Sequence, residues 1–301
     1  MTEKAASRPM SGRDWTMLLL LGAIWGGSFF FASVAVREIQ PIVLVLFRVA
    51  IASAALWVYL AARRIPVAPA LPLVPAFFGL ALLNNVIPFS LMFTGQTAIG
   101  AGLASILNAT TPFWTMLLAN ALLADEKLTA RRAAGVLLGI AGTAIMVGPG
   151  LVANLGGPVW AKFALLGTAM SYACAAIFAR RFRALRPEVV ATGQLSASTL
   201  IMIPVVLALH DPATLFSAGP QTWAAVLALA LLATAFAYIL FFGLIASAGS
   251  TNASLVTLIV PVSAILLGAV FLSERLELFE IGGMALIGLG LLVIDGRLLR
   301  R

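Results

Sequence analysis

Polar side chains lie deep inside apolar runs of this chain, where their chemistry suits the binding of a solute. Asn84 and Asn85 stand side by side in one such run, and Arg48 is the only formal charge well inside another. Carboxamides and a guanidinium supply several hydrogen-bond donors and acceptors, and leaving such groups unpaired in an apolar medium is costly. We therefore expect each to be paired with another helix or turned toward a cavity that holds a polar ligand.

The candidate ligand-binding residues share this setting, and each is an amide, an aromatic residue or an arginine. They are Trp25, Arg48, Asn84, Asn85, Asn108, Trp114, Tyr172, Tyr238 and Asn252. For the adjacent asparagines the alternative is a hydrogen bond between helices, and at most one of them can face a cavity squarely because neighbouring helical side chains point about 100° apart. Arg48 has three open interpretations: it snorkels to the surface, holds backbone carbonyls, or meets an anionic group of a ligand.

Two prolines within apolar runs, Pro112 and Pro261, are candidate hinges. A proline inside a helix leaves a carbonyl without its donor and bends the axis, which provides both an acceptor for a ligand and a point of bending. Packing geometry alone is the alternative for either proline. Their equivalent positions in the internal repeat described below favour the hinge.

The sequence lacks the residue clusters that hydrolytic and metal chemistry require. The single histidine, His210, ends an apolar run, and the single cysteine, Cys174, lies within one. A serine protease of the Ser-His kind needs a buried histidine base, and a membrane zinc protease needs His-Glu-x-x-His. Asp125 and Glu126 form the only acidic pair, at the end of a run where a helix cap or surface ion pair is expected. We expect no enzyme, no metal and no cofactor.

The sequence that contains these residues has an internal repeat. Residues 76–118 align with residues 225–267 without a gap. The informative matches involve glycine, serine, proline and charged residues: Gly100/Gly249, Ser105/Ser254, Pro112/Pro261 and, after one skipped residue, Glu126/Glu274, Gly135/Gly283 and Gly142/Gly290. The pattern indicates two related halves, residues 1–147 and 148–301.

Composition places both halves in a membrane. Hydrophobic residues make up 62% of the chain and charged residues 10%, and the mean hydropathy is +1.07, too apolar for one soluble core. The 301 residues leave room for about ten helical spans of about 20 residues each. We predict spans at 15–36, 42–62, 71–93, 98–124, 130–147, 159–179, 190–209, 223–244, 249–272 and 278–294. Because lipid offers backbone groups no partner, these runs predict an all-α membrane protein.

The distribution of positive charge predicts the orientation. With the N-terminus inside, the cytoplasmic side holds fifteen of the nineteen lysines and arginines. Five spans per half is an odd number, so the second half must be inverted relative to the first. The net charge of +8 then reflects topology, and we expect no binding of nucleic acid. Both termini are expected in the cytoplasm.

The first apolar run could be mistaken for a signal peptide, because Lys4, Arg8 and Arg13 precede it. Removing it would leave the sixth span without a counterpart in the repeat. We therefore expect the first span to be retained.

Several features together resemble the EamA-type transporters of the drug/metabolite transporter superfamily. They are the ten-span layout, Trp25 followed by Gly26, Arg48 in the second span, the mid-span prolines Pro112 and Pro261, and Glu126 and Glu274 ahead of glycine-patterned spans. The resemblance implies two inverted five-helix repeats around a central cavity, walled by spans one, three, four, six, eight and nine, with the fifth and tenth at the side. It also implies alternating access in a bacterial inner (cytoplasmic) membrane, by a monomer or weak homodimer.

The residue chemistry narrows the expected solute. Amides, hydroxyls and aromatic rings with one cation suit neutral or zwitterionic solutes, whereas phosphorylated solutes would need more fixed cations. Overall likeness is greatest to the branch that exports amino acids, including aromatic ones, and we expect such a small-molecule substrate. Two alternatives stay open: export of other drugs or neutral metabolites, and a non-transporting membrane sensor or assembly protein.

Overall fold

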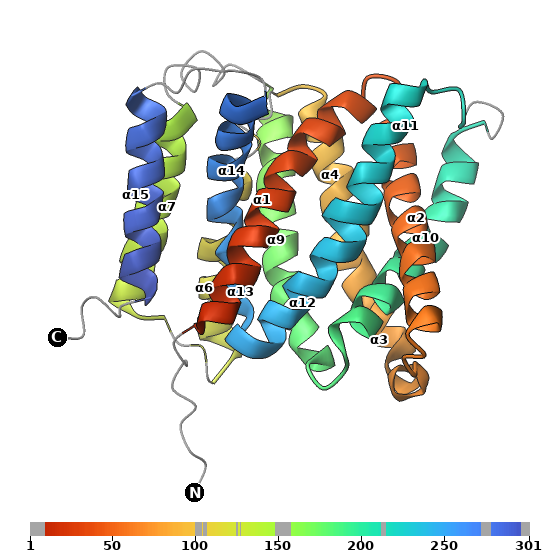
Figure 1. Ribbon diagram of the computed structural model, residues 1–301, viewed down its shortest axis with the longest axis horizontal. Helices are drawn as coiled ribbons and strands as arrows, with labels where there is room; N and C mark the ends of the chain where they lie inside the picture. Colours follow the sequence, from red (N-terminus) through yellow and green to blue (C-terminus); the bar gives the residue numbers. More distant parts are fainter. Residues whose placement is uncertain are drawn as a thin grey trace, which may run out of the picture.

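The fold is a bundle of helices (Figure 1). A computed structural model describes residues 10–99, 104, 107–124, 126, 128–147, 158–211, 215–271 and 278–295, and within them all regular secondary structure is helical. The first half contains α1 (Gly12–Ala35), α2 (Pro41–Ala62), η1 (Ala68–Leu73), α3 (Val74–Ala81), η2 (Leu82–Val86), α4 (Ile87–Gln96), α6 (Thr111–Leu122) and α7 (Ala130–Val147). The second contains α9 (Val159–Ala179), η3 (Arg180–Phe182), α10 (Pro187–Leu209), α11 (Pro220–Leu227), η5 (Ala228–Phe236), α12 (Ala237–Ala248), α13 (Ser250–Ser254), α14 (Val256–Phe271) and α15 (Leu278–Asp295).

Six helical segments are long and apolar enough to cross a bilayer. They are Gly12–Ala32, Pro41–Ala62, Ala68–Gln96, Val159–Phe182, Pro187–Leu209 and Pro220–Ala248, with shorter apolar helices at Ser250–Ser263 and Ile281–Ile294. Large apolar side chains cover the outside of the bundle, and Val58, Phe163 and Leu200 are each more than 60% exposed. Such a surface suits lipid. The expectation of an all-helical membrane protein is confirmed, while the predicted span at 98–124 lies partly outside the described residues.

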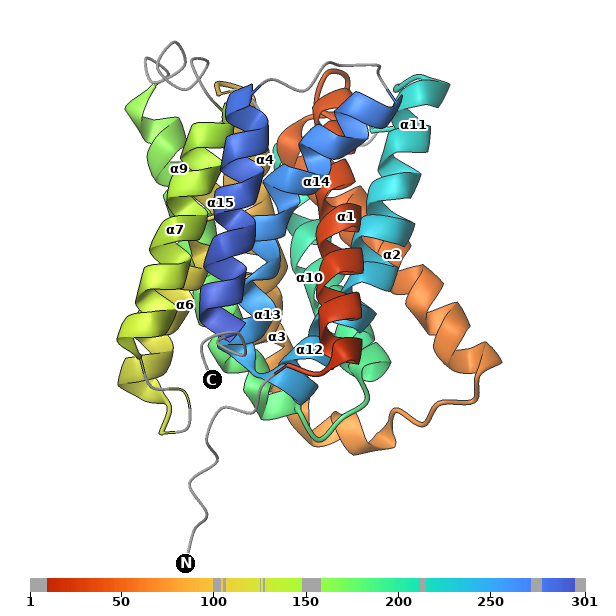
Figure 2. The same ribbon diagram turned by 60° about the vertical axis from the view of Figure 1, so that its left-hand side comes forward.

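The two halves run in opposite directions. In Figure 1, α1 rises from the lower side of the bundle whereas α9 descends from the upper side. This is the relation that an inverted repeat requires. Both views place α7 and α15 side by side at one edge of the bundle, away from α2 and α10 (Figures 1 and 2).

Glycines allow α7 and α15 to approach closely. A Cβ atom on Gly290 would lie 2.5 Å from the carbonyl oxygen of Gly135, and one on Gly142 would lie 2.7 Å from the carbonyl oxygen of Gly283. Side chains at these positions would push the two backbones apart. The glycine pattern of the fifth and tenth spans therefore serves helix packing.

Two π-helical segments occupy equivalent places in the repeats. Residues 82–86 form η2 and correspond to residues 231–235, which lie within the second π-segment, η5. Short π-helical segments interrupt regular α-helices and occur frequently at functional sites. In each half the interruption falls in a long apolar helix at the centre of the bundle, where the polar residues gather.

The two candidate hinge prolines occupy different places in their helices. Pro112 lies in the first turn of α6, where a missing N–H costs no helical hydrogen bond. Pro261 lies inside α14 and removes the donor that would pair with the carbonyl of Thr257. A break at Leu255 also separates α13 from α14. The ninth span therefore has two points at which regular pairing is interrupted.

Candidate functional site: a central cavity

A cavity lies between the two halves at the centre of the bundle. Its lining residues come from α1, α2, η2, α4, α6, α9, α12, α13 and α14 and from residue 108: Trp25, Ser28, Phe29, Arg48, Asn84, Phe89, Met92, Asn108, Thr111, Tyr172, Ala176, Tyr238, Phe241, Ser254, Val256, Thr257 and Val260. The cavity volume is about 60 Å³, well below the roughly 300–1,000 Å³ of typical small-molecule sites. A larger solute therefore requires the walls to move apart.

Arg48 is buried in the wall of this cavity, with 3% of its surface exposed. Its Nε donates to the hydroxyl of Thr234 at 2.6 Å and its Nη2 to the carbonyl of Ala233 at 3.3 Å. The guanidinium lies over the ring of Phe89, 3.9 Å from the centroid, a favourable cation–π geometry. Arg48 thus holds a backbone carbonyl and does not snorkel, and it also borders the cavity.

Aromatic residues form much of the remaining wall. The indole nitrogen of Trp25 donates to the carbonyl of Ala233 at 3.0 Å, the same carbonyl that Arg48 contacts. Trp25 also meets Tyr238 edge to face, with centroids 6.3 Å apart, and Tyr172 approaches Phe89 in the same manner at 6.5 Å. These contacts fix the orientation of the rings.

The adjacent asparagines separate into different environments. Asn84 lines the cavity, and its amide nitrogen donates to Oε1 of Gln194 on α10 at 3.0 Å. Asn85 is fully buried, donates to the hydroxyl of Ser198 at 2.8 Å and accepts from the hydroxyl of Tyr238 at 2.6 Å. Asn85 therefore joins three helices, while Asn84 both joins helices and faces the cavity.

Asn108 and Thr257 are equivalent in the repeat and both line the cavity. The carbonyl of Asn108 accepts from the hydroxyl of Thr111 at 2.6 Å. Its side-chain oxygen is buried and has no hydrogen-bond partner within the described part of the chain. A buried oxygen in this state is an unused acceptor.

The structure thus brings six of the nine candidate binding residues together on the cavity wall: Trp25, Arg48, Asn84, Asn108, Tyr172 and Tyr238. The other three have different surroundings. Asn85 lies behind the wall, Trp114 donates its indole N–H to the hydroxyl of Thr110 at 3.2 Å, and Asn252 donates to the carbonyl of Ala248 at 2.9 Å. Gln194 and Ser198 were not among the candidates, although they hold the two asparagines.

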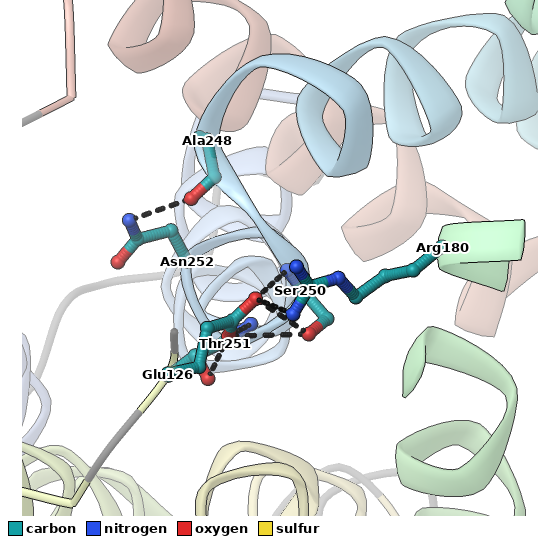
Figure 3. Close-up of polar contacts among 6 residues, drawn as sticks. All are labelled: Glu126, Arg180, Ala248, Ser250, Thr251 and Asn252. Carbon is teal, nitrogen blue, oxygen red and sulfur yellow. Dashed lines mark hydrogen bonds and ion pairs between the residues drawn. The ribbon is translucent and has the colours of Figure 1, made fainter. Parts of the chain in front are cut away.

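A second polar cluster, the Glu126 clamp, joins the halves near α13, which lies at the lower side of the bundle in Figure 1. Figure 3 shows its contacts. Glu126 is only 8% exposed. Its carboxylate accepts from the backbone N–H groups of Ser250 and Thr251 at 3.1 and 3.0 Å and from the Thr251 hydroxyl at 2.5 Å. It also forms an ion pair with Arg180 at 3.1 Å. A carboxylate at a helix N-terminus satisfies N–H groups that have no partner within the helix.

Gly249 makes this approach possible. Its φ of +86° lies in the region that favours glycine, and a Cβ atom there would lie 2.8 Å from Oε1 of Glu126. The expected role of Glu126 as a cap or ion-pair partner is therefore observed, but the group is buried and the capped helix belongs to the other half. Asp125 and Glu274 lie outside the described residues.

The electrostatics of the cavity are one-sided. Arg48 is the only charged side chain among the described residues that line it. The remaining polar lining consists of amides and hydroxyls. A single fixed cation in an otherwise neutral wall attracts one anionic group, and it attracts it strongly because the surroundings are apolar.

A cavity with a mainly apolar lining and a few polar groups, enclosed by helices from two oppositely directed halves, is the architecture of a multi-pass membrane transporter. The chain belongs to the EamA-like transporter family, whose sequence profile matches residues 15–148 and again residues 159–295. The resemblance seen in the sequence is thereby confirmed, as is its duplication.

Individual relatives agree with this family. The chain is 27% identical over 296 residues to a "Probable amino-acid metabolite efflux pump" of Salmonella typhimurium strain LT2, covering 94% of this chain and 95% of that protein. A protein of the same name from Escherichia coli strain K12 is 27% identical over 302 residues, with the same coverage. An "Uncharacterized transporter" of Archaeoglobus fulgidus is 26% identical, covering 91% of this chain and 95% of that protein.

The fold is also found in a crystal structure whose title reads "Crystal structure of protein". The two chains superpose with a TM-score of 0.76 at 20% identity, covering 96% of this chain and 98% of the other. At this identity the likeness concerns the fold alone.

Proposed function

We propose that this protein exports amino acids, including aromatic ones, across the bacterial inner membrane by alternating access. In this account ten spans form two inverted repeats, residues 1–147 and 148–301, with both termini in the cytoplasm. The observation that carries the proposal is the cavity itself, because its wall is drawn from both halves and combines one cation, neutral polar groups and aromatic rings.

The lining chemistry supports an amino acid as substrate. Trp25, Phe89 and Phe241 offer apolar surface for a side chain, and Arg48 offers a positive charge for a carboxylate. Two relatives carry a name that refers to efflux of amino-acid metabolites. These observations favour amino acids over phosphorylated solutes, which would call for additional cations.

The Glu126 clamp supports an alternating-access mechanism. It joins the chain after α6 to the start of α13 and the end of α9, and so ties the halves together on one side. With the predicted topology this side is cytoplasmic, so an intact clamp would hold the two halves together toward the cytoplasm. Opening toward the cytoplasm then requires the clamp to release, and the same movement widens the small cavity.

Export can be tested in bacterial cells that take up phenylalanyl dipeptides and hydrolyse them. Cells that produce the protein should release phenylalanine faster than cells without it. Ala176→Phe, which fills the cavity wall, should abolish the difference, and Ala134→Phe on the exposed face of α7 should preserve it. Both variants are first checked for equal amounts in the membrane. If Ala176→Phe speeds release as much as the wild type does, a transport path through this cavity is contradicted. If neither protein speeds release beyond that of cells without it, a sensor or assembly role is favoured.

A further inference from the structure

We propose that Arg48 and Asn108 are the two poles of a site for a zwitterion. The free Nη1 of Arg48 receives the substrate carboxylate, and the side-chain oxygen of Asn108 receives the ammonium group. The inference rests on the proposed function, because it assigns how an amino acid is oriented in the transport cavity.

Unpaired polar atoms mark these two positions. Five buried side-chain atoms of the described residues have no hydrogen-bond partner: Arg48 Nη1, Gln96 Oε1, Asn108 Oδ1, Glu188 Oε2 and Gln194 Nε2. Of the residues that carry them, Arg48 and Asn108 line the central cavity. One atom is a donor and the other an acceptor. Since a buried polar group left unpaired is costly, a ligand with complementary groups would satisfy both.

The charge of Arg48 makes it the carboxylate pole. Its contacts among the described residues are to a hydroxyl, a carbonyl and two aromatic rings, all of them neutral. Among the described residues it has no carboxylate within ion-pair distance. A buried cation without a counter-ion is unfavourable in an apolar medium. A carboxylate that binds Nη1 supplies both the missing acceptor and the missing charge.

The two repeats differ at the position of Arg48, and this difference would orient the bound substrate. Gln194 on α10 is the counterpart of Arg48 on α2, so the second half carries a neutral amide where the first carries a cation. The amide nitrogen of Asn84 already donates to Oε1 of Gln194. An anionic group therefore has one charged partner in the cavity rather than two equivalent ones, and the carboxylate is directed to the α2 side.

The ammonium pole needs an acceptor and no fixed negative charge. Asn108 Oδ1 is such an acceptor, and Thr111 and Thr257 also line the cavity. Neutral acceptors hold an ammonium less tightly than a carboxylate would, which permits release. Aromatic and aliphatic residues that also line the cavity, such as Trp25, Phe29 and Phe241, are left for the substrate side chain.

The test uses purified protein in liposomes and measures inhibition of labelled L-phenylalanine exchange by three unlabelled compounds. Phenylalanine carries both charged groups, phenylalaninamide lacks the carboxylate, and 3-phenylpropionate lacks the ammonium. Labelled leucine, with leucinamide and 4-methylpentanoate, is measured in parallel. With wild-type protein we expect each analogue to require at least a tenfold higher concentration than the amino acid for half-inhibition.

Variants then separate the poles. Arg48→Gln should remove the advantage of phenylalanine over its amide while keeping its advantage over phenylpropionate. Asn108→Ala should remove the advantage of phenylalanine over phenylpropionate while keeping its advantage over the amide. Arg48→Lys, which retains the charge, should keep the preference for the carboxylate even if the Gln variant does not fold. Gln96→Leu is the matched control, because it removes an unpaired buried oxygen that does not line the cavity, and it should leave both ratios unchanged.

The outcomes distinguish the inference from the proposed function. If the amide inhibits wild-type exchange as well as the amino acid does, or if Arg48→Gln leaves that ratio unchanged, the amino-acid carrier stands and the assignment of the poles is overturned. If neither phenylalanine nor leucine is exchanged, the proposed function itself is contradicted, and the inference with it. Stronger inhibition by phenylpropionate than by phenylalanine would replace the zwitterion with a monocarboxylate.

Discussion

Arg48 and Gln194 contact equivalent points of opposite repeats. Arg48 on α2 donates to the carbonyl of Ala233 in η5, and Gln194 on α10 accepts from the amide of Asn84 in η2, the counterpart of Ala233. Each of these two contacts holds a π-helical segment of the other half. The side chain that makes the contact is charged in one case, Arg48, and neutral in the other, Gln194. The repeat therefore provides a nearly symmetric scaffold, and a single residue difference makes the cavity electrostatically asymmetric.

Replacing Gln194 should show how much its hydrogen bond with Asn84 contributes to stability. We expect Gln194→Leu to lower the free energy of unfolding by about 1–2 kcal/mol, because it leaves the amide of Asn84 without its partner. Asn84→Leu should lower the free energy of unfolding less in the Gln194→Leu variant than in the wild-type protein. Unfolding in detergent measures both effects as a double-mutant cycle, and strictly additive losses would show that the two side chains do not interact.

The two tryptophans among the candidate residues should respond differently to the same substitution. Trp25→Phe removes an indole N–H that donates to Ala233 in the cavity wall, and we expect the half-saturating substrate concentration to rise about fivefold. Trp114→Phe removes a contact to Thr110 away from the lining and should leave this concentration nearly unchanged. Initial exchange rates over a range of substrate concentrations measure both, and a larger effect at Trp114 would place the site elsewhere.

Loss of the Glu126 carboxylate should expose the amides that it caps. Glu126→Gln removes the ion pair with Arg180 and weakens the bonds to Ser250 and Thr251. We expect the free energy of local opening at these two residues to fall by about 2 kcal/mol. Their backbone amides should then exchange hydrogen about thirtyfold faster, as measured by amide hydrogen exchange.

The matched control is Glu38→Gln, since Glu38 accepts from the backbone N–H of Gly219 at 2.7 Å at the start of α11. This variant should speed exchange at Gly219 and leave Ser250 and Thr251 unchanged. Unaltered protection at those two residues in Glu126→Gln would show that the clamp does not hold this side closed.

The two prolines should differ as hinges. Pro261→Ala restores an N–H that can pair with the carbonyl of Thr257, and an interior proline costs a helix about 3 kcal/mol. We expect a more stable and stiffer α14, and a maximal exchange rate that falls several-fold. Pro112→Ala, in the first turn of α6, should change the rate less. The maximal rates of the purified variants decide this, and an unchanged rate in Pro261→Ala would remove Pro261 as a hinge.

The fold could be predicted from the sequence because its causes are local and periodic. Long apolar runs predict helices in lipid, and duplicated glycines and prolines indicate two related halves. The repeat could also have identified Gln194 as a residue of the site, because Gln194 occupies the position of Arg48 in the second half. Identifying it required extending the alignment into the less similar first spans.

Contacts between the halves could not be predicted in the same way. Glu126 caps residues that lie about 125 positions further along the chain, and no periodicity connects them. The surroundings of Trp114 and Asn252 depend on breaks in the fourth and ninth spans, because a continuous helical pattern does not relate side-chain directions on the two sides of a break. The separation of Asn84 from Asn85 follows from helical geometry, but which of them faces the cavity depends on the packing of α10 and α12.

Counterflow tests the central claim most directly. Liposomes that contain the purified protein are loaded with unlabelled phenylalanine or leucine, and trace labelled amino acid is added outside. If a single site opens alternately to the two sides, the label will accumulate transiently above its outside concentration, the rate will saturate, and Asn84→Leu will abolish both effects. Entry of label without accumulation or saturation would instead identify a channel and contradict alternating access through this cavity.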